Sequence, residues 1–477
     1  MTGSVEEQHV QAIVSYLERG SDRGCSRCLG IEIEHFVVDV EAARPVFYED
    51  DPETGKVGVA GILAELSSAY HKAVYNAPFK NQMAKGPARI IGLERPGANV
   101  TLEPGAQLEI SMGPVLQLSS LEGLYTSFRA ELDPILESHG YRLLTLGYQP
   151  FANAADIPMI PKQRYHYMDR YFQGTGHHGI CMMRGSASTQ VSLDYANEPD
   201  ALRKLRVANA LGPILAFLTD NSPVFETLPV GIGHGRLTAS GLELPSRMTR
   251  TRIWDDVDPT RCMLAPGSMS ANFSFRRYAE SLMRAGAVFS ELAEEFGEHA
   301  SVYQGTRSAA ETYAGRELSR EDVEHILSLF FFDNRFKTYI EIRLADSLPI
   351  GYALAFCALL GGLFYSSDNL DWLDARLESV SADAVAAAKR SLEADAWDAD
   401  VYGRSATEWL DALMLRSDEG LDEGERHYLK PLADLVARRS TLFDDLRSAA
   451  LDGSGGEESF DLRLVLHTEG DDADFGV

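Results

Sequence analysis

The chain has 477 residues, and its 44 Lys and Arg against 71 Asp and Glu give a formal net charge of −27. This acidic balance argues against binding to a nucleic-acid backbone or to an anionic membrane, which both select basic surfaces. Hydrophobic residues make up 45% and charged residues 24%, as in a globular protein that buries a large core without disulfides. No apolar run reaches the roughly 18 residues of a membrane-spanning helix, and the first residues do not resemble a signal peptide. The five cysteines predict a reduced, cytoplasmic protein.

The first half of the chain alternates helices with strands that carry polar groups on one face. Val10, Ile13, Val14 and Leu17 recur at helical spacing. In chain order we predict a helix over 1–20, a strand over 29–39, an alternating strand at 107–111 within the segment 101–112, with a turn or bulge at Pro104 and Gly105 at its start, a helix over 116–139, and strands over 141–147 and 188–194.

The second half is richer in helices. Asn197 is a suitable N-cap for a helix that ends at Asn221-Ser-Pro223. A strand follows over 336–344, then an apolar helix over 350–365 that is too short to span a membrane, and helical spacing continues from 370 to 450. We therefore predict an α+β fold with a largely antiparallel sheet that has one wet, acidic face. The predicted units are a catalytic domain over 1–365, a helical subdomain over 366–451 and a flexible acidic tail over 452–477.

Carboxylates gather on the polar faces of these strands. Glu32 and Glu34 lie two residues apart, so they point to the same side. Glu109 follows Gln107 in the same way, and Glu341 precedes Arg343. Carboxylates on one face raise each other's pKa, and a divalent cation removes that repulsion. Mg²⁺ takes oxygen ligands and is often shared with nucleotide phosphates, so this face suits Mg-nucleotide chemistry. The alternative is a solvated outer face of the sheet.

Other motifs are weaker. Residues 174–179 fit the G-x-G-x-x-G pattern of dinucleotide-binding sites, but they follow no strand. The sequence contains no P-loop motif. Cys25 and Cys28 form a lone C-x-x-C without a second ligand pair for zinc, which leaves a redox sensor or two unreactive thiols. His177 and His178 are adjacent, so we expect them to lie in a loop and to point in different directions.

Seven segments, in order over roughly 29–365, resemble the glutamate–cysteine ligases of the plant and proteobacterial branch. They are G-I-E-I-E-H-F at 30–36, L-E-P-G-A-Q-L-E-I-S at 102–111, P-K-Q-R-Y at 161–165, M-M at 182–183 with T-Q-V-S-L-D at 189–194, R-K-L-R at 203–206 with N-S-P at 221–223, R-T-R-I-W-D at 250–255, and Y-I-E-I-R-L-A-D at 339–346. The chain departs from the family pattern at Ser192, where Asn is usual, at Ala106, where Gly is usual, and at Leu344, where Gly often stands.

The resemblance implies a fold similar to glutamine synthetase, with a curved, mainly antiparallel sheet forming a funnel and helices outside. It also implies an ADP-forming amide-bond ligase that joins the γ-carboxylate of glutamate to the amine of L-cysteine through γ-glutamyl phosphate, with ATP as co-substrate and Mg²⁺ as cofactor. Such an enzyme has small-molecule substrates and needs neither a nucleic acid nor a membrane. Two alternatives stay open: a related ligase with another amine acceptor, and a catalytically inactive homologue.

The resemblance also assigns roles to residues. The Mg²⁺ ligands that it implies are Glu32, Glu34, Glu103, Glu109 and Glu341. Arg343 would meet the transferred phosphate, and Arg250 would clamp a carboxylate of glutamate. Gln190 would face the substrate. Lys162 and Arg164 would contact phosphate or substrate, unless they belong to a solvated basic loop.

Overall fold

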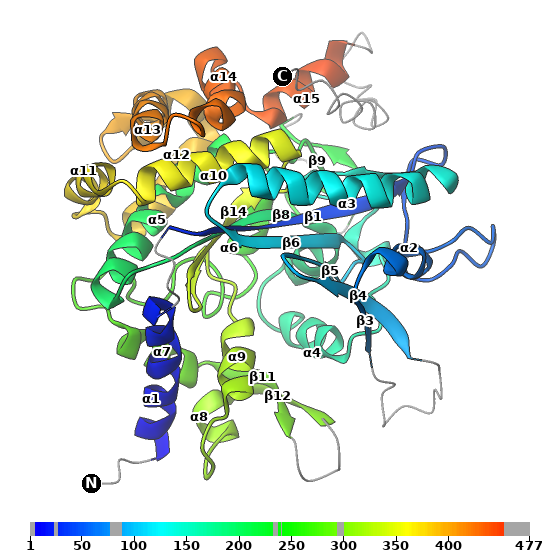
Figure 1. The fold of residues 1–477 in the computed structure, drawn as a ribbon, viewed down its shortest axis with the longest axis horizontal. Helices are drawn as coiled ribbons and strands as arrows, with labels where there is room; N and C mark the ends of the chain where they lie inside the picture. Colours follow the sequence, from blue (N-terminus) through cyan, green and yellow to red (C-terminus); the bar gives the residue numbers. More distant parts are fainter. Residues whose placement is uncertain are drawn as a thin grey trace.

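The core of the molecule is a ten-stranded sheet in which every recorded strand pair is antiparallel (Figure 1). The computed structural model describes residues 5–22, 27–76, 88–231, 237–239, 241–292 and 300–452. Along the sheet the order is β13 (Asn334–Phe336), β14 (Ile340–Asp346), β8 (Ser188–Leu193), β1 (Leu29–Asp39), β6 (Leu108–Val115), β5 (Ala98–Leu102), β4 (Arg89–Arg95) and β3 (Lys72–Asn76), while β2 (Arg44–Pro45) and β7 (Tyr141–Leu144) also pair with β1. The α+β class and the antiparallel sheet are confirmed.

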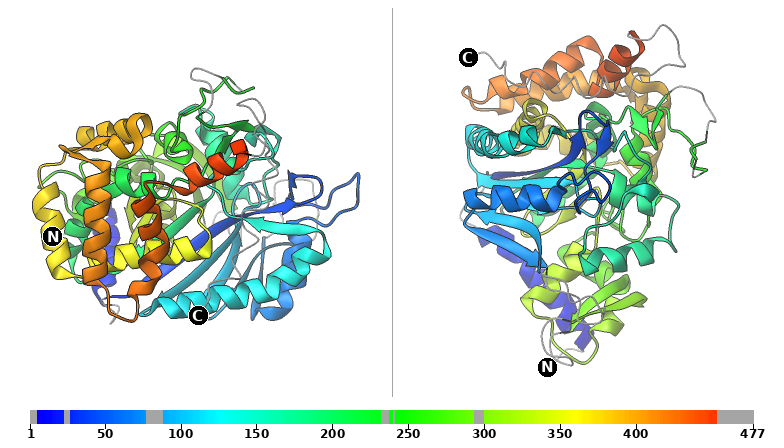
Figure 2. Two further views of the ribbon diagram at one scale, coloured as in Figure 1. Left: turned by 90° about the horizontal axis from the view of Figure 1, so that it is seen from above. Right: turned by 90° about the vertical axis from the view of Figure 1, so that its right-hand side faces the viewer.

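Helices cover the sheet on both sides (Figures 1 and 2). The first ten are α1 (Val5–Glu18), α2 (Val59–Leu66), α3 (Leu118–Ser138), α4 (Gln163–Phe172), α5 (Glu198–Leu218), α6 (Thr249–Asp255), α7 (Phe275–Arg284), α8 (Ala309–Thr312), α9 (Arg320–Ser328) and α10 (Ile350–Phe364). In Figure 1, α3 and α10 lie above the sheet, whereas α4 and the hairpin of β11 (Gly286–Leu292) and β12 (Ala300–Ser308) lie below it. The β5–β4–β3 end of the sheet turns down toward α4, so the lower face is concave there.

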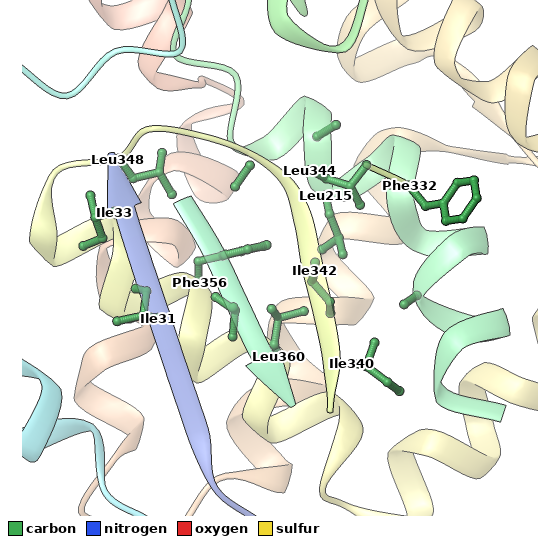
Figure 3. Packing of buried hydrophobic residues seen from close by; sticks show 14 of the residues in the cluster. Ile31, Ile33, Leu215, Phe332, Ile340, Ile342, Leu344, Leu348, Phe356 and Leu360 are labelled. Carbon is green, nitrogen blue, oxygen red and sulfur yellow. The ribbon is translucent and has the colours of Figure 1, made fainter. Parts of the chain in front are cut away.

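The two-residue period of the strands separates the apolar core from the polar face. Ile31 and Ile33 of β1 are at most 1% exposed, and Figure 3 shows them beside Phe356 and Leu360 of α10. The residues between them therefore point away from α10, to the other face of the sheet. Because α10 is apolar on all sides, nearly all of it is buried. The packing of β1 against α10 therefore directs the carboxylates of β1 toward the concave face.

Several predicted boundaries agree with the structure. The strand predicted over 29–39 is β1 with the same bounds. Asn197 caps α5, since its side chain accepts a hydrogen bond from Asp200 N. The alternating strand predicted at Gln107–Ser111 is the start of β6, and the turn predicted before it at Pro104 and Gly105 is closed by a hydrogen bond from Glu103 N to Gln107 O. The residues before that turn, up to Leu102, belong to β5.

The C-terminal helices pack against the same core. They are α11 (Ser367–Leu377), α12 (Ala382–Asp395), α13 (Ala406–Gly420), α14 (Lys430–Arg438) and α15 (Leu442–Asp452). Buried residues of α10 through α14 belong to one hydrophobic cluster with the sheet. In the described part of the chain no single helix is long and apolar enough to cross a membrane, although α10 and α11 pass that test as a pair bent by 82°. The tail predicted over 452–477 lies, beyond its first residue, outside the described residues.

The packing of α10 on the sheet can be tested by truncating one side chain. Leu360→Ala removes a side chain that is 0% exposed, and we expect a loss of about 2–5 kcal/mol in the free energy of unfolding. Leu415→Ala is the control, because Leu415 is 60% exposed and should cost less than about 0.5 kcal/mol. Urea unfolding of both variants measures the difference. Equal, small losses would show that the α10 interface does not stabilise the sheet.

Candidate active site

Strand register places polar side chains in rows across the concave face. Glu32 of β1 pairs with Gln190 of β8 on one side and with Ser111 of β6 on the other. One step along, Glu34 pairs with Glu109 of β6. β1 and β6 therefore present their glutamates together, beside Gln190 of β8. The sequence predicted the shared face of Glu32 and Glu34 on β1, and it could not predict which strands lie next to them.

Three of these glutamates repel one another. Glu34 and Glu109 are buried, and Glu32 is half-buried. Burial, and then the charges of Glu103 and Glu109, raise the pKa of Glu34 to about 8. Burial, and then Glu109, raise the pKa of Glu32 to about 7. The pKa of Glu109 is also raised, by burial first and by Glu103 second. We call Glu32, Glu34, Glu103 and Glu109 the acidic half of the site.

Hydrogen bonds hold two members of the acidic half in place. Glu34 accepts from Ser188 N at 2.7 Å, from Ser188 Oγ at 2.9 Å and from Gln190 Nε2 at 3.0 Å. Glu109 accepts from Thr101 Oγ1 at 2.7 Å and from Ser111 Oγ at 3.1 Å. Both carboxylates thus face the same concave surface in fixed orientations.

The turn between β5 and β6 carries Glu103 into this group. Its glycine is required, because a Cβ on Gly105 would lie 2.4 Å from Arg184 O. Lys162 Nζ donates to Leu102 O at 2.8 Å. Burial lowers the pKa of Lys162 to about 8, against the opposing effect of Glu103. The structure therefore places Lys162 beside the acidic half, and not in a solvated basic loop.

Arg164 lies at the start of α4, next to Tyr165. Its guanidinium carbon is 5.8 Å from the centroid of the Tyr165 ring. Its Nε is buried and has no hydrogen-bond partner within the part of the chain that the structure describes. The hydroxyl of Tyr165 donates to Leu102 O at 3.1 Å, so this residue pair belongs to the same wall of the site as Lys162.

Glu341 differs from the other glutamates because three cations surround it. Its Oε1 accepts from Lys337 Nζ at 2.6 Å, and its Oε2 accepts from Arg343 Nη1 at 2.8 Å and from Arg335 Nε. Burial alone would raise the pKa of this carboxyl, but the three cations together hold it well below the usual range. We call these four residues the basic half of the site.

This finding corrects one expectation. The sequence suggested that all the clustered carboxylates raise each other's pKa, and for Glu341 this is wrong. The physical reason is the hairpin of β13 and β14, whose register sets Arg335 directly opposite Glu341. The other cations follow in the connecting turn and on β14 itself.

Gln190 joins the two halves. Its Nε2 donates to Glu34 and its Oε1 accepts from Arg343 Nη1. Only 3% of Gln190 is exposed. In this structure Gln190 therefore bridges an acidic and a basic side chain, and Arg343 is fixed from two sides.

Arg250 extends the basic side of the site. Its Nη1 donates to Arg343 O at 3.0 Å. With Arg343, Trp254 and Asp333 it lines a cavity of about 20 Å³, and its buried Nε has no hydrogen-bond partner among the described residues. Lys389 of α12 holds Asp333 in the lining of this cavity, because its Nζ lies 2.9 Å from Asp333 Oδ2. A buried guanidinium with a free donor is suited to a carboxylate.

The donor chemistry of the acidic half suits a divalent cation, while the side chains are not preassembled around one. Four carboxylates supply the oxygen ligands that Mg²⁺ prefers, and a cation would relieve the repulsion that raises their pKa values. Yet, over the described residues, no group of three or more His, Cys, Asp or Glu side chains is spaced to hold a metal ion. Metal binding would therefore draw these carboxylates closer together.

The weaker motifs lie outside this site. His177 Nδ1 and His178 Nδ1 lie 3.0 and 2.8 Å from the same oxygen, Asp256 Oδ2. Our expectation that they point apart is wrong, because the backbone at Gly176 runs against Asp256, whose carbonyl oxygen would lie 2.0 Å from an added Cβ.

Cys28 is disulfide-bonded, so the expectation of a reduced, unreactive thiol there is also wrong. C-x-x-C spacing does not by itself set the redox state of its sulfurs. Cys25 lies outside the described residues.

Comparison with known proteins assigns the family. The model of glutamate–cysteine ligase family 2 (GCS2) matches residues 28–461. The chain belongs to this family. The match includes every residue of the acidic and basic halves.

Individual relatives are more distant. A chloroplastic glutamate–cysteine ligase of Arabidopsis thaliana is 28% identical over 376 residues, which is 77% of this chain and 66% of that protein. For glutamate–cysteine ligase B of Oryza sativa subsp. japonica, also chloroplastic, the identity is 28%, over 75% of this chain and 66% of the relative. The chain thus spans slightly less than two thirds of the length of these relatives. The structure of a Francisella tularensis glutamate–cysteine ligase in complex with AMP aligns with a TM-score of 0.49 at 12% identity, over 92% of this chain and 86% of that one.

The raised pKa values predict how stability depends on pH. Folded Glu32 and Glu34 keep their protons up to pH values of about 7 and 8, whereas unfolded glutamates lose them near 4.5. In EDTA the free energy of unfolding should therefore fall as the pH rises from about 4.5 to about 8. Glu34→Gln should flatten this slope in part, since Asp220 has a pKa raised in the same direction. Mg²⁺ should stabilise the wild type more at pH 8 than at pH 5.

Chemical unfolding across this pH range measures the effect. Exposed Glu423 supplies the control, and Glu423→Gln should keep the wild-type slope. An unchanged slope in Glu34→Gln would contradict the raised pKa of Glu34.

Proposed function

We propose that this protein is an ATP-dependent glutamate–cysteine ligase, which joins the γ-carboxylate of glutamate to the amine of L-cysteine and forms γ-glutamylcysteine. The observation that carries the proposal is the family match over residues 28–461. The division of the site into an acidic and a basic half supports it, because a nucleotide with its divalent cation needs both kinds of surface. The proposal includes the cytoplasm as the compartment, on the sequence expectation alone; the matched plant relatives are named chloroplastic.

The reaction needs an activated carboxylate. A carboxylate is a poor acyl donor, because oxide and hydroxide are poor leaving groups. Transfer of the γ-phosphoryl group of ATP gives γ-glutamyl phosphate, whose phosphate leaves readily when the amine attacks the acyl carbon. Phosphoryl transfer depends mainly on positioning and on the neutralisation of charge. A rigid set of buried cations is therefore the feature that such a site requires.

The basic half provides that set. Arg343 offers forked donors to the transferred phosphoryl group, and its contacts with Gln190 and Glu341 keep the guanidinium in one orientation. Arg250 would bind a carboxylate of glutamate with its free donor. Gln190 would keep the acidic half and the basic half in a fixed position relative to each other while substrates bind. Lys162 and Arg164 lie on the opposite wall, where they would contact substrate or phosphate.

The acidic half would hold Mg²⁺ through Glu32, Glu34, Glu103 and Glu109. When bound, the cation supplies charge neutralisation for the phosphates of the nucleotide. Glu341 can contribute a further oxygen ligand to the metal ion once another anion binds the lysine and arginine side chains that now contact Glu341. The carboxylates would hold that cation, and only through it would they influence where the phosphates lie relative to the γ-carboxylate of glutamate.

One observation keeps the alternative amine acceptor open. Ser192, where the family usually has Asn, pairs with Glu341 on one side and with Gly30 on the other. A serine between a glycine and a glutamate leaves more room than an asparagine, and the change lies inside the site. A related ligase with a different amine is therefore the second candidate function. An inactive homologue is disfavoured, because the carboxylates and Arg343 are all present.

Turnover with defined substrates tests the proposal. With MgATP, glutamate and L-cysteine, the protein should form γ-glutamylcysteine and release ADP and phosphate, and phosphate release should be low with either amino acid alone. Mass spectrometry identifies the product. A product with another amine, but none with cysteine, would establish the alternative ligase. No ATP turnover with any amine would contradict a ligase function.

Variants of the basic half test its role in catalysis. Glu341→Gln should lower kcat on the order of 100-fold or more, and it should also lower the melting temperature, because three buried cations lose their carboxylate. Arg343→Lys keeps the charge but loses the forked donors, so its kcat should fall as well.

The matched control is Glu131→Gln. Glu131 also pairs with an arginine, Arg95, at 2.6 Å, but it lies on α3. Its kcat should equal that of the wild type. A near-normal kcat for Glu341→Gln at saturating Mg²⁺ would remove Glu341 from the catalytic site.

A further inference from the structure

Lys337 is a half-buried cation of the basic half, to which neither the sequence motifs nor the proposed chemistry gives a role of its own. It lies in the tight turn between β13 and β14, which a hydrogen bond from Lys337 N to Tyr339 O closes at 2.8 Å. Its ammonium contacts Glu341 Oε1 at 2.6 Å and lies 5.4 Å from the centroid of the Tyr339 ring. The turn thus points a lysine back onto the concave face of the sheet.

The three cations of the basic half differ in exposure, although each has a contact besides Glu341, which for Lys337 is Tyr339. Arg335 also donates to Phe330 O, and Arg343 also donates to Gln190, so each guanidinium has two kinds of acceptor. The side chain of Lys337 is 24% exposed, compared with 9% for Arg335 and 11% for Arg343. Of the three, Lys337 is therefore the cation that an incoming ligand reaches most easily.

The charges of the basic half do not balance. Three cations surround one carboxylate in this half. Glu32 of the acidic half also attracts them, but its pKa is raised to about 7, so positive charge is in excess in this largely buried place. Such an excess favours a polyanion over a second carboxylate, because a phosphate chain can satisfy several cations at once. The two carboxylate oxygens of Glu341 have different partners: Oε2 contacts both arginines, while Oε1 contacts Lys337.

We propose that Lys337 is a further catalytic residue, whose ammonium leaves Glu341 Oε1 and binds an oxygen of the transferred phosphoryl group. This proposal rests on the proposed function, since it takes the polyphosphate of a nucleoside triphosphate as the ligand. The exchange has a consequence for the acidic half. When Lys337 moves to phosphate, Glu341 Oε1 becomes available to a divalent cation, so phosphate and cation would bind cooperatively.

Binding of inorganic tripolyphosphate tests the proposal without turnover. Calorimetry in EDTA, with the full chain, compares Lys337→Met and Lys337→Gln with the wild type. Each variant should bind tripolyphosphate on the order of 10-fold more weakly, the scale of one charge-assisted hydrogen bond, and Lys337→Arg should recover most of the affinity. Lys337→Gln keeps a side-chain donor for Glu341 Oε1. It therefore still tests the proposal if Lys337→Met does not fold.

The control is Lys430→Met. Lys430 also pairs with a carboxylate, Asp434, on the solvent-exposed side of α14, so this variant loses the same charge from the molecule. It should bind tripolyphosphate as the wild type does. A second readout is kcat with glutamate, L-cysteine and MgATP, which should fall on the order of 100-fold in Lys337→Met.

The outcomes separate the two claims. If the wild type forms γ-glutamylcysteine, and Lys337→Met keeps both its affinity for tripolyphosphate and its kcat, Lys337 only stabilises Glu341 and the inference is wrong. A lowered melting temperature alone would lead to the same conclusion. If the wild type forms no γ-glutamylcysteine but its tripolyphosphate binding depends on Lys337, the proposed reaction is wrong and Lys337 remains a phosphate-binding residue.

Discussion

The strict alternation of side chains in β1 is the constraint on which the rest of the site depends. Ile31 and Ile33 are buried against the apolar helix α10, and this packing fixes the direction of Glu32 and Glu34. A shift of the register by one residue would bury both carboxylates in the core and expose both isoleucines. The hydrophobic core therefore sets the electrostatics of the concave face.

The same sheet then separates charge along its width. The acidic half lies on β1, on β6 and in the turn before β6, while the basic half lies on the β13–β14 hairpin at the edge of the sheet. The two halves meet at Gln190 on β8, the strand between them. Buried like charges cost free energy, so each half is less stable in isolation than in contact with a ligand of the opposite sign. A divalent cation and a phosphate chain are the ligands that would satisfy both halves together.

Much of this arrangement was predictable from the sequence, and the missing parts have physical causes. The alternation of side chains predicted that Glu32 and Glu34 share one face of their strand, and that Glu341 and Arg343 share one face of theirs, because residues two apart on a strand point to the same side. It could not place Glu109 opposite Glu34, because the order and register of strands depend on long-range packing. Arg335 and Lys337 were missed for a different reason. The alternating pattern of 336–344 predicts one strand that starts at Phe336, whereas the chain turns after Phe336, and this turn sets Arg335 opposite Glu341.

The most direct measurement of this account is a crystal structure with Mg²⁺ and a non-hydrolysable ATP analogue. We expect the terminal phosphate between Arg343 and Lys337, the divalent cation among the oxygens of the acidic half, and Glu341 Oε1 no longer in contact with Lys337. A nucleotide bound away from the concave face, or one bound there with Glu341 still in contact with all three cations and no metal among the glutamates, would contradict the account.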